Sequence, residues 1–122
     1  MAGQFRFVIS TDRYDETVAF YRDRLGFAVG DSWDRSPAER GTIFDVGSGL
    51  VEVLWGDRAP TVSGIHISVE VDDVDTAFRE AAGRDATVQS EPADYPWGHR
   101  GCAFSDPNGV VVGLFTEIGE PR

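Results

Sequence analysis

Hydrophobic and polar residues follow two different periods in the first half of the chain. Phe5 to Ile9 is rich in Phe, Val and Ile, as in a strand, and ends at polar residues that commonly begin helices. From Tyr14 onward, apolar residues recur every three or four positions up to Gly26, which predicts a helix ending there. Three short strand-like segments follow, at Phe27–Trp33, Gly41–Val46 and Leu50–Trp55. The predicted order is therefore strand, helix and three strands.

The second half of the chain repeats this order. Ile65 to Val71 alternates as a strand does, and Asp72 and Asp73 then cap a predicted helix that ends at Gly83. Three further strands are predicted around Thr87–Gln89, Gly101–Ser105 and Val110–Phe115. A shift of 61 positions aligns four pairs of similar residues: Asp12 with Asp73, Asp45 with Asp106, Val51 with Val112, and Val53 with Leu114. We therefore predict an α+β fold of two tandem βαβββ modules that arose by duplication.

Strand alternation sorts the side chains of each predicted sheet into two faces. In the strand that begins at Ile65, His66, Ser68 and Glu70 point to one face and the Ile and Val residues to the other. In the fourth predicted strand, Glu52 points away from the valines on either side of it. Each half supplies one helix, which can cover only one face of its sheet. We expect a ligand to lie on the other face, which carries His66 and Glu52.

Composition and charge exclude several classes of function. The 122 residues carry a formal charge of −10, so binding to a nucleic acid is not expected. All 11 basic residues are Arg, which rules out a catalytic lysine, and Cys102 is the one cysteine, so the chain cannot form an internal disulfide. No apolar stretch is long enough to cross a membrane, and a cytoplasmic location is predicted. The acidity mildly favours cationic or neutral ligands.

Four segments in order resemble the vicinal oxygen chelate superfamily, which includes glyoxalase I, extradiol dioxygenases, fosfomycin-resistance enzymes and bleomycin-resistance proteins. The segments are Val18–Phe27, Gly64–Val69, Pro96–Gly98 and Asp106–Gly109. The resemblance implies one domain over 1–122, with modules of about 1–58 and 61–120 whose curved mixed sheets surround a shared cleft. It also implies a homodimer.

The resemblance further implies where a metal would bind in metal-dependent relatives. Carried over position by position, the four ligands would be Phe5, Glu52, His66 and Gly113, and a phenyl ring and a hydrogen cannot coordinate. We therefore expect no metal cofactor. His66, Glu52 and the loop residue His99 are weak candidates for holding a divalent ion. Alternatively, Glu52 and His66 pair with each other or with a ligand.

We favour a small-molecule-binding protein similar to the metal-free bleomycin-resistance branch, with an aromatic-lined cleft. The candidate contacts are Phe5, Phe7, Glu52, His66, Trp97 and His99. Trp97 either stacks on a flat ligand or anchors its loop. The alternative is a lyase or isomerase of the glyoxalase type, with His66 and Glu52 as acid and base or weak metal ligands. A third hypothesis is an interaction module with a filled cleft.

Overall fold

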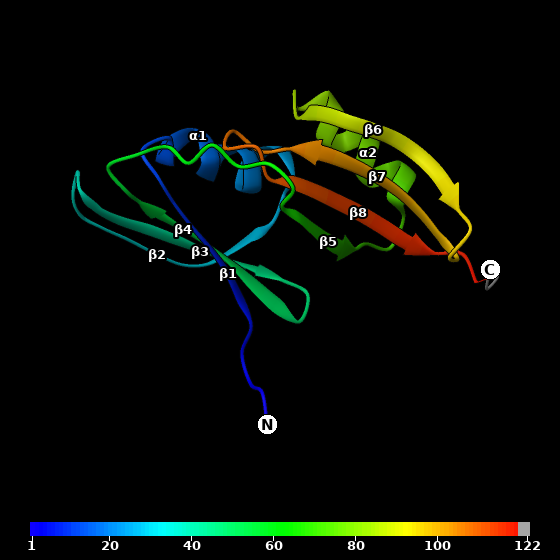
Figure 1. The fold of residues 1–122 in the computed structure, drawn as a ribbon, viewed down its shortest axis with the longest axis horizontal. Coiled ribbons are helices and arrows are strands. Elements are labelled where there is room, and N and C mark those ends of the chain that lie inside the picture. The colour runs from blue at the N-terminus through cyan, green and yellow to red at the C-terminus, as the bar shows by residue number, and fades with distance from the viewer. Residues whose placement is uncertain (120–122) are drawn as a thin grey trace. The chain divides into compact units, whose positions relative to one another are not determined.

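The computed structural model describes residues 1–119, which form two compact units, Met1–Thr61 and the residues from Val62 onward. Each unit contains a four-stranded mixed sheet with one helical segment, so the α+β prediction is confirmed (Figure 1). The predicted end of the second module, residue 120, lies outside the described residues. The shared cleft stays a prediction.

The first unit has the predicted order of strand, helix and three strands. Its elements are β1 (Arg6–Thr11), α1 (Tyr14–Ala19), η1 (Phe20–Arg24), β2 (Ala28–Ser36), β3 (Glu39–Val46) and β4 (Gly49–Trp55). The sheet order is β1-β4-β3-β2, in which β1 runs parallel to β4 and the other neighbours are antiparallel.

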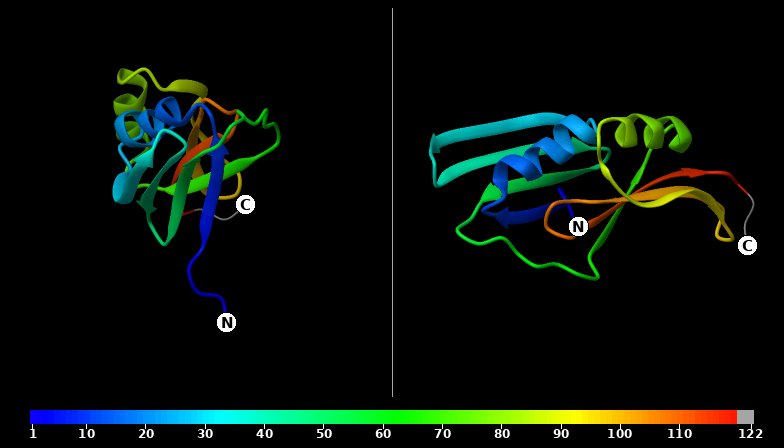
Figure 2. Two further views of the ribbon diagram at one scale, coloured as in Figure 1. Left: turned by 90° about the vertical axis from the view of Figure 1, so that its left-hand side faces the viewer. Right: turned by 90° about the horizontal axis from the view of Figure 1, so that it is seen from above.

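The second unit repeats this arrangement. Its elements are β5 (His66–Glu70), α2 (Val74–Gly83), β6 (Thr87–Tyr95), β7 (His99–Ser105) and β8 (Val111–Glu117). The sheet order is β5-β8-β7-β6, with β5 parallel to β8, and the strands run side by side in this order in Figure 1. The segment from Gly56 to Ile65 links the units and contains neither helix nor strand (Figure 2).

The two helical segments begin and end differently. The carboxylate of Asp73 caps α2, because it accepts hydrogen bonds from the backbone N–H groups of Asp75 and Thr76. The single helix predicted up to Gly26 is wrong in its second half, where the chain widens into the π-helix η1. The N–H of Leu25 bonds to the carbonyl of Phe20, and Gly26 then reverses the chain at a φ of 76°.

Each unit buries its own aromatic core between helix and sheet. In the first unit, Phe44 on β3 and Tyr21 on η1 are both fully buried, with ring centroids 5.9 Å apart. In the second, Phe104 on β7 is fully buried and stacks on Phe78 of α2 at 5.6 Å. The helix of each unit therefore covers this face of its sheet and leaves the opposite face without a helix. No helix in the described part of the chain is long and apolar enough to span a bilayer.

The internal repeat is present, but its spacing changes by one residue along the chain. Phe44 pairs with Val51 as Phe104 pairs with Val112, so β3 and β7 are offset by 60 positions and β4 and β8 by 61. The additional residue lies in the turn between β7 and β8. The alignments of Val51 with Val112 and Val53 with Leu114 are therefore confirmed. Those of Asp45 with Asp106 and Asp12 with Asp73 are wrong, because the β7 equivalent of Asp45 is Ser105 and the capping position of α1 is Arg13.

The same registers correct one predicted metal-ligand position. His66 pairs with Val111, and the residue that pairs with the equivalent Leu50 is Arg6. The first-strand counterpart of His66 is therefore Arg6, and Phe5 lies one residue before β1. A shift of one residue moves a side chain to the other face of a strand, which is why sequence spacing alone misplaced it.

The predicted strand β6 is much too short. It was expected around Thr87–Gln89, but it continues to Tyr95. Its pairing with β7 is irregular on both sides of Ser90, and Pro92 lies within the second irregularity. These irregularities interrupt the alternating pattern that sequence analysis depends on.

Candidate functional site

The second unit contains a cavity of about 570 Å³ on the face of its sheet that α2 does not cover. Each of the four strands of the unit contributes to the lining. The lining residues are His66, Ser68, Ser90, Tyr95, Trp97, His99, Gly101, Cys102, Ala103, Gly113, Leu114 and Phe115. The lining is mainly apolar, and His66 and His99 are its imidazole groups.

Strand alternation separates this cavity from the helix side of the sheet. On β7, Arg100 and Phe104 contact residues of α2, so His99 and Gly101 between and beside them point to the opposite face. On β8, Phe115 pairs with Gly101 and therefore shares the cavity face. Alternate residues of adjoining strands therefore form most of the cavity surface, and Cys102 and Leu114 between them complete the lining.

Two stacked aromatic pairs, Tyr95 with Trp97 and His99 with Phe115, line the cavity. The rings of Tyr95 and Trp97 lie 4.7 Å apart with an interplanar angle of 12°. The imidazole of His99 lies 4.3 Å from the ring of Phe115 at 15°. Trp97 remains 47% exposed, so it offers surface to a ligand. Flat, parallel rings of this kind suit another flat ring better than a globular aliphatic group.

The turn that carries Trp97 is held by main-chain hydrogen bonds. The N–H of Gly98 bonds to the carbonyl of Tyr95 at 3.1 Å, and the carbonyl of Gly98 accepts from the N–H of Ile118 at 2.9 Å. Gly98 has a φ of 87°, which other residues rarely adopt. The Tyr95–Trp97 pair is therefore part of the sheet edge and not of a long loop.

The imidazole of His66 lies over Gly113 in the cavity lining. A Cβ atom on Gly113 would lie 2.6 Å from Nε2 of His66, so the imidazole occupies the space that a side chain at 113 would need. Two more small residues, Gly101 and Ala103, line the cavity on the neighbouring strand β7. The missing side chain at Gly113 therefore both removes a potential ligand and makes room for the His66 ring.

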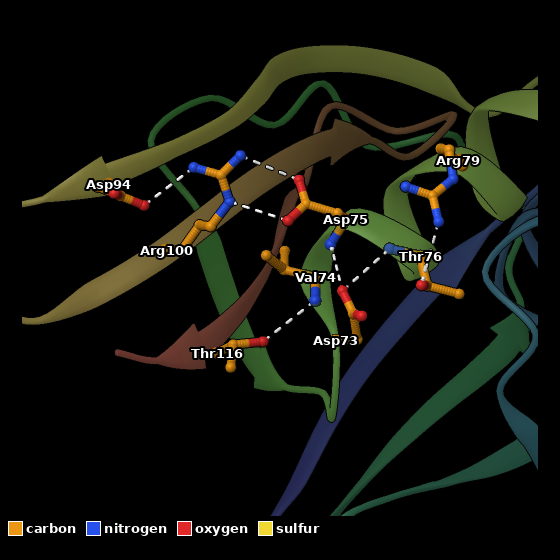
Figure 3. A network of polar contacts seen from close by, with 8 residues as sticks. All are labelled: Asp73, Val74, Asp75, Thr76, Arg79, Asp94, Arg100 and Thr116. Atoms are coloured by element: carbon orange, nitrogen blue, oxygen red, sulfur yellow. Dashed lines mark hydrogen bonds and ion pairs between the residues drawn. The ribbon is translucent and has the colours of Figure 1, made fainter. Parts of the chain in front are cut away.

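Arg100, on the helix side of β7, connects the sheet to α2. Arg100 donates from Nε and Nη2 to both carboxylate oxygens of Asp75, at 3.0 Å each, and from Nη1 to Asp94 at 2.9 Å (Figure 3). The hydrogen bonds from Arg100 lower the pKa of Asp75. Thr116 accepts from the N–H of Val74 and so fixes the start of α2 as well. This network fixes β7 to α2 at Arg100, the residue that follows His99.

The equivalent face of the first unit is arranged differently. Nη1 of Arg6 lies 2.8 Å from Oε1 of Glu52, across the parallel pair β1 and β4. Phe7 pairs with Val51 and so points to the opposite face from Glu52. Phe5 is 71% exposed. Phe7 and Glu52 therefore cannot contact one ligand from the same face of this sheet, as the sequence prediction assumed.

The structure brings together three of the six predicted contact residues. His66, Trp97 and His99 line the cavity of the second unit, whereas Phe5, Phe7 and Glu52 belong to the first. Sequence analysis missed Tyr95 and Phe115. Phe115 could have been found by continuing the alternation of β8 from Gly113, but the irregular pairing of β6 hid Tyr95.

Cys102 is a packing residue and not a nucleophile. The side chain is buried, and this burial raises the pKa of its thiol to about 11. A thiol with this pKa is protonated at neutral pH.

The donor set at the four implied metal positions does not fit a metal site. With the register corrected, these positions are Arg6, Glu52, His66 and Gly113, and the guanidinium of Arg6 already binds the carboxylate of Glu52. A cation cannot serve as a ligand, and glycine has no donor atom in its side chain. Among residues 1–119, three or more His, Cys, Asp or Glu side chains do not gather into a possible metal site.

The chain belongs to the Glyoxalase/Bleomycin resistance protein/Dioxygenase superfamily, whose family model matches residues 3–114. The resemblance inferred from the four sequence segments is thereby confirmed. A search of curated proteins found no match.

Several solved structures share the fold of this chain. TioX from Micromonospora sp. ML1 is 22% identical with a TM-score of 0.77, covering 95% of this chain and 99% of its own. A superfamily member from Sphaerobacter thermophilus DSM 20745 is 26% identical with a TM-score of 0.73, with coverages of 96% and 98%. TnmS3, an antibiotic binding protein from Streptomyces sp. CB03234, is 23% identical with a TM-score of 0.73, with coverages of 96% and 97%.

Proposed function

We propose that this protein binds a small organic molecule with a planar ring system in the cavity of the second unit, without a metal ion. The observation that carries the proposal is the pair of parallel aromatic stacks, Tyr95 with Trp97 and His99 with Phe115, around a floor of small residues. A planar ligand can lie against these rings and bury apolar surface there.

The size and chemistry of the cavity support this assignment. Its volume of about 570 Å³ is typical of sites for drug-sized molecules. Ser68, Ser90 and the two imidazoles supply a few polar groups that can orient a ligand within a mainly apolar lining. The family relationship agrees, because TnmS3 is described as an antibiotic binding protein.

The proposal includes no metal ion because the residues at the four positions implied for metal ligands do not supply enough donor atoms. Glu52 is engaged by Arg6, and the position of Gly113 offers no ligand atom. Binding therefore depends on stacking and apolar burial instead of chelation.

Titration with acridine, a neutral planar probe at mildly alkaline pH, tests the proposal. Isothermal calorimetry on the full chain should give saturable binding, and Trp97→Ala should weaken it roughly tenfold or more because one wall is lost. Trp33→Ala is the matched control, since this tryptophan lies against Gly41 in the first unit and its removal should leave the affinity unchanged. Acridine that fails to bind, or that binds equally well after Trp97→Ala, would sink the proposal.

One observation favours the alternative, an enzyme of the glyoxalase type. The imidazole of His66 lines the cavity and could move a proton to or from a bound molecule. Glu52 is a poor partner in that reaction, because its carboxylate binds Arg6. Stoichiometric metal in protein purified without chelator, lost on His66→Ala, would favour the enzyme. The homodimer and the cytoplasmic location stay predictions.

A further inference from the structure

Charged residues of the second unit are divided unevenly between the two sides of its sheet. The described arginines of this unit are Arg79, Arg84 and Arg100. Arg79 lies on α2, Arg84 is the C-cap residue of α2, and Arg100 faces α2 through its bonds to Asp75. Every described positive side chain of this unit is therefore placed on or toward the helix.

Two carboxylates lie on the opposite, cavity-bearing side. Glu70 is on the same face of β5 as His66 and Ser68, and it pairs with Phe115 in the register of β5 and β8. Glu117 is on the same face of β8 as Phe115, and it pairs with His99 in the register of β7 and β8. The two glutamates therefore flank the His99–Phe115 stack on two sides.

Neither glutamate is neutralised within the described part of this unit. Both side chains are exposed, and neither forms an ion pair or a side-chain hydrogen bond with another described residue of the second unit. The acidic groups that do have cationic partners, such as Asp75, Asp94 and Glu80, all contact the arginines on the helix side. No arginine among the described residues of this unit therefore pairs with the negative charge beside the His99–Phe115 stack.

We infer that Glu70 and Glu117 determine the charge class of the ligand, and that the ligand is a planar aromatic cation. This inference rests on the proposed function, since it assumes that the cavity binds a planar ring. Aromatic faces attract cations through the ring quadrupole, and the two carboxylates add Coulomb attraction beside the His99–Phe115 stack. An anionic ligand of the same shape would meet repulsion with no described arginine of this unit to offset it.

Two probes of nearly equal shape separate charge from shape. N-methylacridinium carries a permanent positive charge, whereas acridine is neutral at mildly alkaline pH. In low salt, the full-length protein should bind the cation roughly tenfold more tightly than acridine. Added salt should reduce this preference, because exposed charges are screened.

Charge-removing variants test the assignment to these two residues. The double variant Glu70→Gln/Glu117→Gln should bring the preference to about one, and each single change should lower it about threefold, with acridine affinity unchanged in all three. Glu80→Gln on α2 is the control, because it removes the same charge from the helix side and should leave the preference intact. Circular dichroism and Tm measurements establish that the variants fold.

The failures of the two proposals are distinguishable. A wild-type protein that binds acridine, loses it with Trp97→Ala, and shows no preference for the cation would overturn this inference and leave the proposed function standing. A preference that survives in the double variant, or that falls equally with Glu80→Gln, would also overturn the inference. A protein that binds neither probe would overturn both.

Discussion

The two units of this protein share an arginine–aspartate contact and a buried phenylalanine on the helix side of the sheet, and they differ on the opposite side. In the first unit Arg40 binds Asp15 of α1 at 3.0 Å, and in the second Arg100 binds Asp75 of α2 at the same distance. Each arginine is in the third strand of its unit and each aspartate is in the first turn of its helix. The buried Phe44 and Phe104 also occupy equivalent positions.

The sheet faces away from the helices carry different chemistry at equivalent positions. Arg6 and Glu52 form an ion pair in the first unit, whereas their counterparts His66 and Gly113 leave an imidazole lying over a glycine in the second. The first unit thus carries two long, oppositely charged side chains at these positions, whereas the glycine of the second unit leaves room for the imidazole that lines the cavity. The two units are thus more alike on the helix side of the sheet than on the side that faces away from the helices.

The largest expected effect concerns the shared helix side. Phe44→Ala and Phe104→Ala should each lower the free energy of unfolding by about 3–5 kcal/mol, because each removes a fully buried ring from a packed core. Urea denaturation of each variant measures the loss. Phe5→Ala is the control, since a ring that is 71% exposed should matter by less than about 0.5 kcal/mol. A small effect at only one of the two buried positions would show that the cores are not equivalent.

A smaller effect should separate the two arginine contacts. Because the hydrogen bonds from Arg100 lower the pKa of Asp75 in the folded state, this carboxylate stabilises the fold above its ordinary pKa, and the benefit disappears as pH falls through the lowered value. The Tm of Asp75→Asn should therefore lie below that of the wild type at neutral pH and approach it in acid, as the pH falls below the ordinary pKa of an aspartate.

Asp15→Asn is the comparison for this effect. Asp15 accepts one hydrogen bond from its arginine, whereas Asp75 accepts two, and the side chain of Asp15 is 83% exposed against 44% for Asp75. The Tm loss at neutral pH should be smaller for Asp15→Asn. An equal or larger loss, or a gap for Asp75→Asn that persists in acid, contradicts the assignment.

The sequence predicted the order of elements because that order depends on local periods and caps. The capping role of Asp73 and the alternation of His66, Ser68 and Glu70 were both readable without coordinates. The register between distant strands was not, because one additional residue between β7 and β8 shifted the alignment and placed Phe5 where Arg6 belongs. Tyr95 was missed because the irregular pairing of β6 interrupts its alternation.

The partner of Glu52 also escaped the sequence analysis. Glu52 was expected to pair with His66 or a ligand, but a neighbouring strand supplies Arg6 at 2.8 Å. Which strands are neighbours in a sheet depends on tertiary contacts, and those cannot be derived from the periodicity of one segment. The correct face could be predicted for Glu52, and its partner could not.

The central claim is that the cavity face of the second unit binds a planar organic molecule. The most direct measurement is an NMR titration of the full chain with acridine that follows the three indole N–H signals of Trp33, Trp55 and Trp97. The account predicts a saturable shift of the Trp97 signal, while those of Trp33 and Trp55 in the first unit stay in place. A saturable shift of Trp33 or Trp55 without one at Trp97, or no shift at all, would contradict it.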